Sequence, residues 1–427
     1  MSVPVDSSSQ VDAPKQGLFR ISFEGCCAVR LVFDQWSFRV TPARLVLLAL
    51  AAIAGLIIVL RLILGLGGQL PFMGEWGNIT NLNDEWPWGL WIGFDVLCGV
   101  ALAGGGYATA LIVYILHNDQ LKPIARATLL TSLIGYILVV VSLFVEIGRW
   151  WNFWRPFVNW GYESILFEVF VCISLYTVVQ VLELCEIITE KVFRMFHKFF
   201  VTVMPFLLIL GVVLPTLHQS SLGALYLMMD GKLHQLWFSP NIFLFFLLSS
   251  FFVGPAMIAL ESVLTYFSYK HVTPLHVLRT LARIGGTIMA LYLVLKIADL
   301  VYHHKLPLLW EGTFESYAFW LEIGIGLVIP ILIVASPLVN YRSWIIIYGA
   351  LTVFGVILNR MNVVITGMWR STDTPYYPSI MEVMVTVGLV AGGILAYMAL
   401  CENFNILGDE SHEQADNVKN SETEPAA

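Results

Sequence analysis

The sequence predicts an all-α integral membrane protein, and three observations lead to that prediction. Of its 427 residues, 58% are hydrophobic and only 12% are charged, whereas a soluble domain carries about 25% charged residues. Ten apolar runs each reach about 20 residues, the length that crosses a bilayer as a helix. The runs are continuous rather than alternating, and the loops between them are short, which argues against a β-barrel. The composition excludes an ordinary cytosolic enzyme, a nucleic-acid-binding protein and a disordered chain.

The ten runs define one membrane domain over residues 45–402, between an N-terminal segment over 1–44 and a tail over 403–427. The runs are residues 45–67, 88–116, 124–146, 163–186, 199–217, 241–268, 277–302, 316–336, 343–368 and 380–402. Seven acids and one lysine in the last 26 residues predict a solvated, disordered tail. The first 40 residues are polar or mildly amphipathic, and the first run is long enough to span, so no cleavable signal peptide is expected.

The basic residues indicate the orientation. Fifteen Lys and Arg residues fall on the side of the two termini, five on the other side and three inside runs. Cytoplasmic segments carry the excess of Lys and Arg, so both termini are expected in the cytoplasm. The external loops are rich in Trp and Pro. Trp is typical of the membrane interface, but a docking surface for an external partner is an equal alternative.

Charged residues inside the runs need a reason, because each costs about 2.5–3.5 kcal/mol at the bilayer centre on insertion scales. Glu168 and Glu261 have no basic residue one helical turn away, so they favour a proton relay over an ion pair. Lys296 with Asp299, and Arg360 with a carboxylate, are better explained as ion pairs that hold helices together. The ten residues in or near the runs are Arg61, Asp95, Glu168, Glu183, Glu261, Lys296, Asp299, Glu322, Arg360 and Glu382.

The most informative segment is Leu214–Gly223. Pro215 is expected to end or kink the fifth span, so that His218 lies at the outer interface, followed by Gln219, Ser220 and Ser221. Such a patch could hydrogen-bond a quinone carbonyl and pass a proton to it. A plain helix end remains the alternative, because quinone motifs are weak on their own.

Histidine and cysteine positions argue against a resident metal cofactor. We expect all nine histidines at span ends, in loops or in the tail, which disfavours a bis-His haem in the membrane. The six cysteines form no CxxC motif, so neither an iron–sulfur cluster nor a zinc site is expected. Cys26 and Cys27 are expected to be reduced thiols, with lipidation as an alternative.

Five stretches resemble HybB-type members of the NrfD/polysulfide-reductase (PsrC-like) membrane family. They are Glu85–Asp95 (EWPWGLWIGFD), Gly148–Asn152 (GRWWN), Ser164–Glu168 (SILFE), Leu214–Leu225 (LPTLHQSSLGAL) and Leu233–Trp237 (LHQLW). The resemblance covers nearly the whole chain, with ten spans in matching order, but leaves the first 40 residues unexplained. It implies two four-helix bundles with flanking helices, no haem or cluster, and a quinone near the outer face beside a docked iron–sulfur partner.

The resemblance also implies roles for individual residues. His218 would hydrogen-bond the quinone, Glu168 would exchange a proton with it, and Glu261 with Tyr136 would form the inner part of a proton route. The wider quinone-binding set that the matching segments imply is His218, Gln219, Ser220, Asp95, Arg149 and Arg360.

The sequence therefore predicts the quinone-reactive subunit of a respiratory oxidoreductase complex in the bacterial inner membrane, inactive alone. Electrons would pass from a periplasmic iron–sulfur partner to menaquinone, or in reverse, with coupled proton translocation left open. A nickel–iron hydrogenase is the favoured source of electrons. The alternatives are the same module beside a molybdopterin or multihaem cytochrome c enzyme, a secondary transporter, and a structural anchor without chemistry.

Overall fold

The structure is a computed structural model that describes residues 19–23, 29–33, 36–65, 68, 77–83, 85–115, 118–269, 271–371, 375–404 and 406–407. The first 18 residues and the acidic tail from 408 onward lie outside the described residues, and so does the prediction that the tail is disordered.

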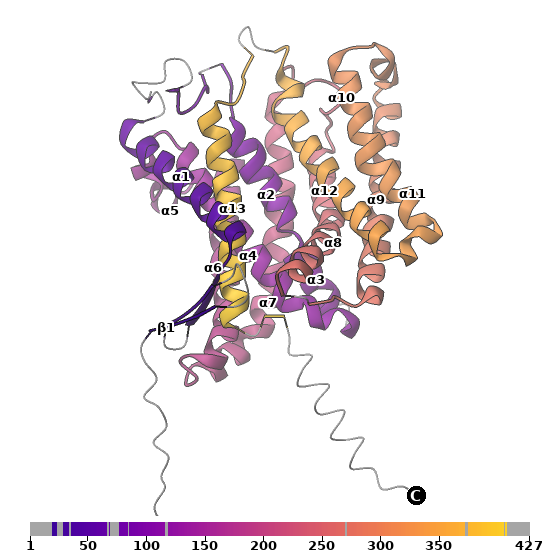
Figure 1. Ribbon diagram of the computed structural model, residues 1–427. Coiled ribbons are helices and arrows are strands. Elements are labelled where there is room, and N and C mark those ends of the chain that lie inside the picture. Colours follow the sequence, from indigo (N-terminus) through magenta and orange to yellow (C-terminus); the bar gives the residue numbers. More distant parts are fainter. Residues whose placement is uncertain are drawn as a thin grey trace, which may run out of the picture.

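Ten helical spans run through the described part of the chain, which confirms the expected fold class (Figure 1). Eight of them are α1 (Pro42–Leu64), α4 (Lys122–Glu146), α6 (Ile165–Lys191), α7 (His197–Ala224), α8 (Ile242–Tyr269), α9 (Leu275–Tyr302), α12 (Arg342–Val364) and α13 (Ile380–Asn403). The second span joins η2 (Trp91–Val96), α2 (Leu97–Leu102), α3 (Gly105–Ala110) and η3 (Leu111–Ile115), and the eighth joins α10 (Phe314–Ile323), η8 (Gly324–Val328) and α11 (Ile329–Ala335). Most boundaries lie within a few residues of the predicted ones.

The fifth span runs further than predicted. We expected it to end at residue 217, but α7 continues through Pro215 to Ala224, and η6 (Leu225–Met229) extends it. Proline removes one helical hydrogen bond, yet neighbouring helices make it tolerable in a membrane span. His218 therefore lies inside a helix, and the prediction that every histidine sits at a span end, in a loop or in the tail is wrong for this residue.

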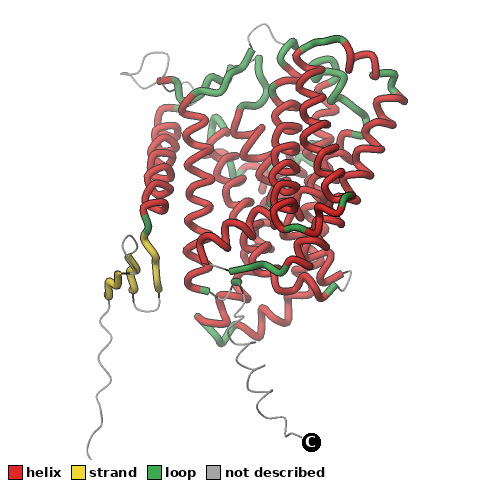
Figure 2. The backbone as a smooth tube through the Cα atoms, turned by 45° about the vertical axis from the view of Figure 1, so that its right-hand side comes forward, coloured by secondary structure: helices red, strands yellow, loops and turns green. Residues whose placement is uncertain are grey.

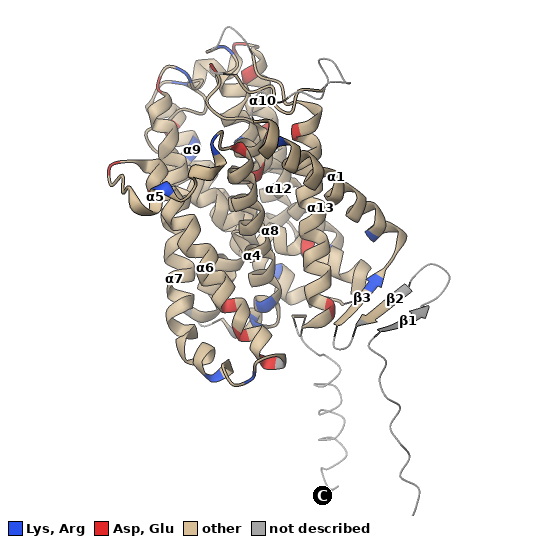
Figure 3. Cartoon of the chain, turned by 90° about the vertical axis from the view of Figure 1, so that its left-hand side faces the viewer, with Lys and Arg blue, Asp and Glu red and all other residues tan. Residues whose placement is uncertain are grey.

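The spans form two groups of four. In the first group, the second span packs on α4 and α7, and α6 packs on the same two helices. In the second group, α8 and α11 each pack on α9 and α12. The first and last spans, α1 and α13, pack on each other and flank the first group through α4. Figure 3 shows the charged residues mainly toward the two ends of this body, with a largely uncharged band between them.

Three short strands precede α1 and were not predicted. Strands β1 (Phe19–Phe23), β2 (Val29–Phe33) and β3 (Trp36–Val40) form an antiparallel sheet in the order β1-β2-β3. The sheet lies at the periphery, below α1 (Figure 2). We call this end of the molecule the sheet end, and the opposite end, with the loops that carry Trp86, Trp150 and Trp310, the aromatic end.

A buried carboxylate fastens the loops of the aromatic end. Glu382, in the first turn of α13, accepts hydrogen bonds from the Thr80 and Tyr376 hydroxyl groups and from the backbone N–H groups of Asn81 and Ser379. Burial, followed by the nearby Glu382 charge, raises the pKa of Tyr376 above its usual range, so the phenol stays a donor. This network ties residues 77–83 to the start of the last span.

The second group is held by a close helix crossing at two glycines. A Cβ atom on Gly326 would lie 2.5 Å from the Cα of Gly355, and one on Gly355 would lie 2.3 Å from the Cα of Gly326. Backbone atoms cannot move aside as a side chain can, so only glycine fits there.

This crossing gives a stability prediction. Gly326→Ala should destabilise the protein by roughly 1–3 kcal/mol, the usual cost of overpacking, and should lower its thermal unfolding midpoint in detergent. Gly324→Ala is the matched control, because a Cβ atom there meets nothing within 4 Å. Equal midpoints for the two variants would show that the helices do not cross this tightly.

Candidate functional site

An apolar groove of ligand size lies in the side of the helical body. It has a volume of about 440 Å³ and lies between α8 and α13, with the second span and α4 as its floor. Its walls include half-buried Met257, Leu260 and Leu264 of α8 and exposed Val390 of α13, so it opens toward the lipid side of the bundle. Its size and composition suit a planar apolar ligand.

Two of the predicted residues line this groove. Asp95, on η2 toward the aromatic end, accepts a hydrogen bond from the Thr386 hydroxyl at 2.9 Å. Glu261, on α8 nearer the sheet end, accepts one from the Tyr397 hydroxyl at 2.6 Å. The second oxygen of Glu261 (Oε2) is buried and makes no hydrogen bond to any described residue. The groove therefore has one carboxylate toward each end.

Glu261 also borders two small cavities. The sheet-end cavity, of about 20 Å³, is lined by Thr128, Thr265, His271 and Thr273 as well as Glu261. The inner cavity, of about 10 Å³, reaches from Glu261 past Thr131 to Ser132. A water molecule needs about 10–15 Å³ and several polar partners, which the sheet-end cavity offers and the inner cavity offers only narrowly. One carboxylate thus meets the groove and both cavities.

On the other side of α4, the structure brings Tyr136 and His218 together. The His218 Nε2 and the Tyr136 hydroxyl lie 2.6 Å apart, and the His218 Nδ1 lies 3.0 Å from the carbonyl oxygen of Leu214. Since a carbonyl only accepts, Nδ1 carries the proton and Nε2 accepts from the phenol. Both side chains are fully buried.

A stripe of polar side chains on α6 extends this pair in both directions. The Tyr176 ring packs edge-on against Tyr136, with centroids 4.5 Å apart. Its hydroxyl lies 3.4 Å from the Ser132 Oγ, to which the Gln180 side-chain amide donates at 2.6 Å. Glu183 follows one turn on, with its Oε1 buried and unpartnered among the described residues.

We call this set the polar column: Glu168, Ser221, His218, Tyr136, Tyr176, Ser132, Gln180 and Glu183. At the aromatic end it begins with Glu168, an exposed residue whose Oε1 accepts from the Ser221 hydroxyl at 2.7 Å. The inner cavity lies at its middle, because Ser132 lines that cavity together with Glu261. The column and the groove therefore flank α4, and the inner cavity joins them, with Ser132 from the column and Glu261 from the groove in its lining.

Arg360 lies apart from both features. Its guanidinium donates to the Asn359 side chain at 2.7 Å and to the Ser249 hydroxyl at 2.6 Å, and stacks 3.6 Å from the Phe246 ring centroid. Asn359 in turn donates to Glu322 at 2.7 Å. The expected ion pair between Arg360 and a carboxylate is therefore not formed among the described residues, because the Asn359 side chain lies between Arg360 and Glu322.

The other predicted residues are spread out. The Lys296 ammonium lies over the Phe245 ring, 4.8 Å from its centroid, and within the described residues no ion pair joins it to Asp299. Arg149 is exposed in the loop before η5 (Trp150–Asn152). Ser220 donates back to the Thr216 carbonyl at 3.2 Å, and the buried Gln219 Nε2 makes no hydrogen bond within the described residues.

Sequence reasoning missed Tyr176, Gln180 and Ser132 and gave Glu183 no role. A signal was present, because Glu168, Cys172, Tyr176, Gln180 and Glu183 recur at the three- and four-residue spacing of one helix face. In the described part of the chain, no group of three or more His, Cys, Asp and Glu side chains could hold a metal ion.

Comparison with known proteins places this arrangement in a family. Residues 78–371 match the family described as "Polysulphide reductase, NrfD". The chain belongs to the NrfD family. This confirms the resemblance found in the sequence, and the N-terminal sheet lies before the matched residues.

Three relatives of known description are similar to this chain. The "Probable Ni/Fe-hydrogenase 2 b-type cytochrome subunit" of Escherichia coli K12 is 32% identical over 365 residues, covering 84% of this chain and 90% of the relative. The "Menaquinone reductase, integral membrane subunit" of Nitratidesulfovibrio vulgaris is 28% identical, covering 69% and 76%. The "Hdr-like menaquinol oxidoreductase integral membrane subunit" of Archaeoglobus fulgidus is 23% identical, covering 84% and 95%.

The words "b-type cytochrome" in the first of these names imply a haem in that protein. Among the described histidines, His218 is the one that lies in a long helix away from its first and last residues, and both of its ring nitrogens are engaged, by Tyr136 and by Leu214. An axial ligand must offer a free ring nitrogen to the iron, so His218 does not fit a haem in this arrangement.

Proposed function

We propose that this chain is the quinone-reactive membrane subunit of a respiratory oxidoreductase in the bacterial inner membrane. It exchanges electrons between an iron–sulfur partner docked at the aromatic end and menaquinone in the bilayer. The observation that carries the proposal is the position of Glu261, which borders both a ligand-sized groove and the internal polar groups. The names of the menaquinone and menaquinol relatives support the choice of substrate.

The groove supplies the ligand-binding part of the proposal. A quinone is a flat apolar ring with two carbonyl oxygens and a long apolar tail, and it reaches its site through the lipid. The groove opens toward lipid and has apolar walls, with Asp95 toward the aromatic end, where electrons would arrive. We place the quinone ring beside Asp95 and its tail along the opening between α8 and α13.

Reduction of the quinone consumes two electrons and two protons, and Glu261 is placed to supply the protons. The sheet-end cavity borders it, and we expect the sheet end in the cytoplasm because most Lys and Arg residues lie on that side. From Glu261 a proton can pass along the groove to the ring. Under this proposal, turnover with hydrogen oxidised on the other side builds a proton gradient.

The polar column provides a second branch. Hydrogen bonds join Ser132 to Tyr176 and Gln180, Tyr136 to His218, and Ser221 to Glu168. The steps between these pairs would need water molecules or side-chain rotation to carry a proton from Ser132 toward Glu168 at the aromatic end or toward Glu183 at the sheet end. Direct binding of the quinone by His218 stays a prediction, because the ring would first have to replace Tyr136 at Nε2. We assign His218 and Tyr136 to proton transfer and Asp95 to the quinone.

Purification of the chain from native membranes, in mild detergent and with a tag at the C-terminus, tests the partner. An iron–sulfur subunit should accompany it, and nickel–iron subunits beside it would identify hydrogen as the electron source. A molybdopterin or multihaem cytochrome partner would change the electron source and keep the quinone reaction. A chain that always purified alone would contradict the proposal and favour a transporter.

The groove can be tested with a pair of matched variants. Val390 and Val387 lie on α13 and are 42% and 41% exposed, but only Val390 lines the groove. Val390→Trp should raise the KM for a menaquinone analogue several-fold, because the indole fills the entrance, while reduction of a soluble dye by the complex is unchanged. Val387→Trp should behave as wild type, and equal effects of the two changes would move the entrance elsewhere.

The position of the quinone ring is tested by binding. Asp95→Asn should weaken binding of a quinol-like inhibitor, whose hydroxyl group donates to the Asp95 carboxylate, by about tenfold or more, since a hydrogen bond to a charged group contributes about 1.5–3 kcal/mol. His218→Gln should slow turnover and leave inhibitor affinity nearly unchanged. The reverse pattern, measured by titration of the purified complex, would place the ring at His218.

Glu261→Gln keeps the shape of the side chain and removes the carboxyl group that can bind and release a proton. Quinone reduction should fall by about 100-fold, the usual scale for a lost proton-transfer group, with dye reduction by the partner intact. Glu168→Gln and Glu183→Gln are compared in the same assay and in vesicles that carry a pH indicator. The variant with the larger loss of proton uptake identifies the end of the column that carries more of the protons. A Glu261→Gln variant that still formed a wild-type gradient would remove this residue from the route.

A further inference from the structure

The N-terminal sheet has one fully apolar side, and the family match does not include it. Its register pairs Phe19 with Phe33, Ile21 with Leu31, Phe23 with Val29, Val29 with Val40, Leu31 with Phe38 and Phe33 with Trp36. The pairs between them join Arg20 with Val32, Ser22 with Arg30, Arg30 with Arg39 and Val32 with Ser37. Residues directly opposite in a ladder lie on the same side of the sheet. One side therefore has nine apolar positions, and the other has three Arg, two Ser and one Val.

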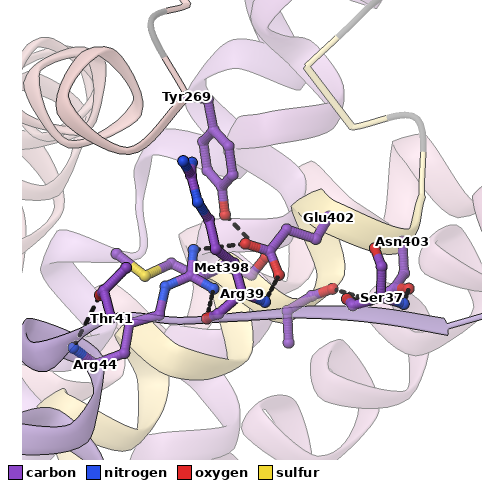
Figure 4. Close-up of polar contacts among 9 residues, drawn as sticks. Ser37, Arg39, Thr41, Arg44, Tyr269, Met398, Glu402 and Asn403 are labelled. Carbon is purple, nitrogen blue, oxygen red and sulfur yellow. Dashed lines mark hydrogen bonds and ion pairs between the residues drawn. The ribbon is translucent and has the colours of Figure 1, made fainter. Parts of the chain in front are cut away.

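Strand β3 holds the sheet firmly against the end of the last span (Figure 4). The Ser37 backbone N–H donates to the Asn403 side chain at 2.8 Å, and Asn403 donates back to the Ser37 carbonyl at 3.0 Å. The Arg39 backbone N–H donates to Glu402 at 3.1 Å, and Arg44 forms an ion pair with Glu402 at 2.6 Å. The sheet is thus a built part of the fold.

The two aromatic side chains on the apolar side of β3 are more exposed than the two side chains on its polar side, although Val40 is half-buried and Trp36 packs edge-on against Phe404. Ser37 and Arg39 are half-buried, whereas Trp36 and Phe38 are 41% and 38% exposed. Soluble proteins rarely leave large contiguous apolar patches in water. A sheet side of nine apolar positions therefore calls for a covering surface.

The connection to α1 indicates what that surface is. Thr41 alone separates the end of β3 from Pro42, where the first span begins. The first turns of α1 are apolar and open to lipid, with Leu45, Val46 and Leu48 between 53% and 60% exposed. The sheet therefore begins where the hydrocarbon layer ends, and it lies outside the helical body, beside this lipid-facing stretch (Figures 2 and 3).

We propose that the apolar side of the β1–β2–β3 sheet lies on the lipid bilayer itself, in the boundary between headgroups and acyl chains of the leaflet at the sheet end. An amphipathic helix does the same when it lies in the membrane plane. The lipid surface covers the apolar side, the polar side faces water, and the end of α13 holds the outer edge of β3. This inference stands independently of the quinone reaction.

Depth-dependent quenching tests the proposal in the full chain. A small fluorescent amino acid is placed at Phe38, on the apolar side, or at the adjacent Ser37, on the polar side, as the matched control. Each protein is reconstituted into phosphatidylethanolamine–phosphatidylglycerol vesicles. Nitroxide lipids labelled near the acyl carbonyl should quench position 38 several-fold more strongly than position 37, and aqueous iodide should quench position 38 weakly.

Two results would overturn the proposal. Strong iodide quenching at position 38 without lipid quenching would show that the apolar side faces water. Protection from both quenchers would show that protein covers it, either a second copy or a partner subunit. A parallel control checks that the fluorescent label leaves the β3–α13 junction intact. Arg44→Ala removes the ion pair with Glu402, so it should lower the thermal unfolding midpoint of labelled and unlabelled protein by the same amount.

Discussion

A carboxylate in the hydrocarbon layer must find its hydrogen-bond donors within the protein, and this constraint organises the interior of the molecule. Glu322 satisfies it, since both oxygens are used by Asn359, Asn362 and Trp237. Glu382 satisfies it as well, and in doing so fixes the loops of the aromatic end. These two groups are parts of the scaffold.

Glu183 and Glu261 differ from them in one respect. Each keeps a buried carboxylate oxygen that no described residue hydrogen-bonds. An unsatisfied buried acceptor costs about 1–3 kcal/mol. Glu315 and Glu402 also keep such an oxygen, but each forms an ion pair with an arginine. Glu183 and Glu261 form none with any described residue, and they lie on either side of α4, next to the column and the groove. That cost is easier to understand if a mobile proton or water molecule uses these oxygens during turnover. The number of hydrogen-bond donors around a buried carboxylate thus distinguishes structural residues from candidate proton carriers better than its depth in the bilayer does.

Much of the fold could be predicted from the sequence, because hydropathy and length dictate where a chain can cross a bilayer. The error at Pro215 arose because packing against neighbouring helices decides whether a proline ends a membrane helix. The meeting of Tyr136 with His218 could not be predicted, since it depends on how α4 and α7 are rotated toward each other. The groove was equally hidden, because four separate spans form it. The alternation in FRISF, VRLVF and WSFRV was visible, and a search for spans alone passes over strands of five residues.

The pairing of the first span with the last has a consequence for biogenesis. During synthesis α1 enters the bilayer long before α13 exists, so its main packing partner arrives only when the chain is nearly complete. The hydroxyl groups that bind Asp95 and Glu261 come from Thr386 and Tyr397, both on α13. In a nascent or truncated chain that lacks the last span, Asp95 and Glu261 therefore lose these hydroxyl donors and face lipid. Two exposed carboxyl groups in the membrane would give a protease or chaperone a way to recognise the incomplete protein.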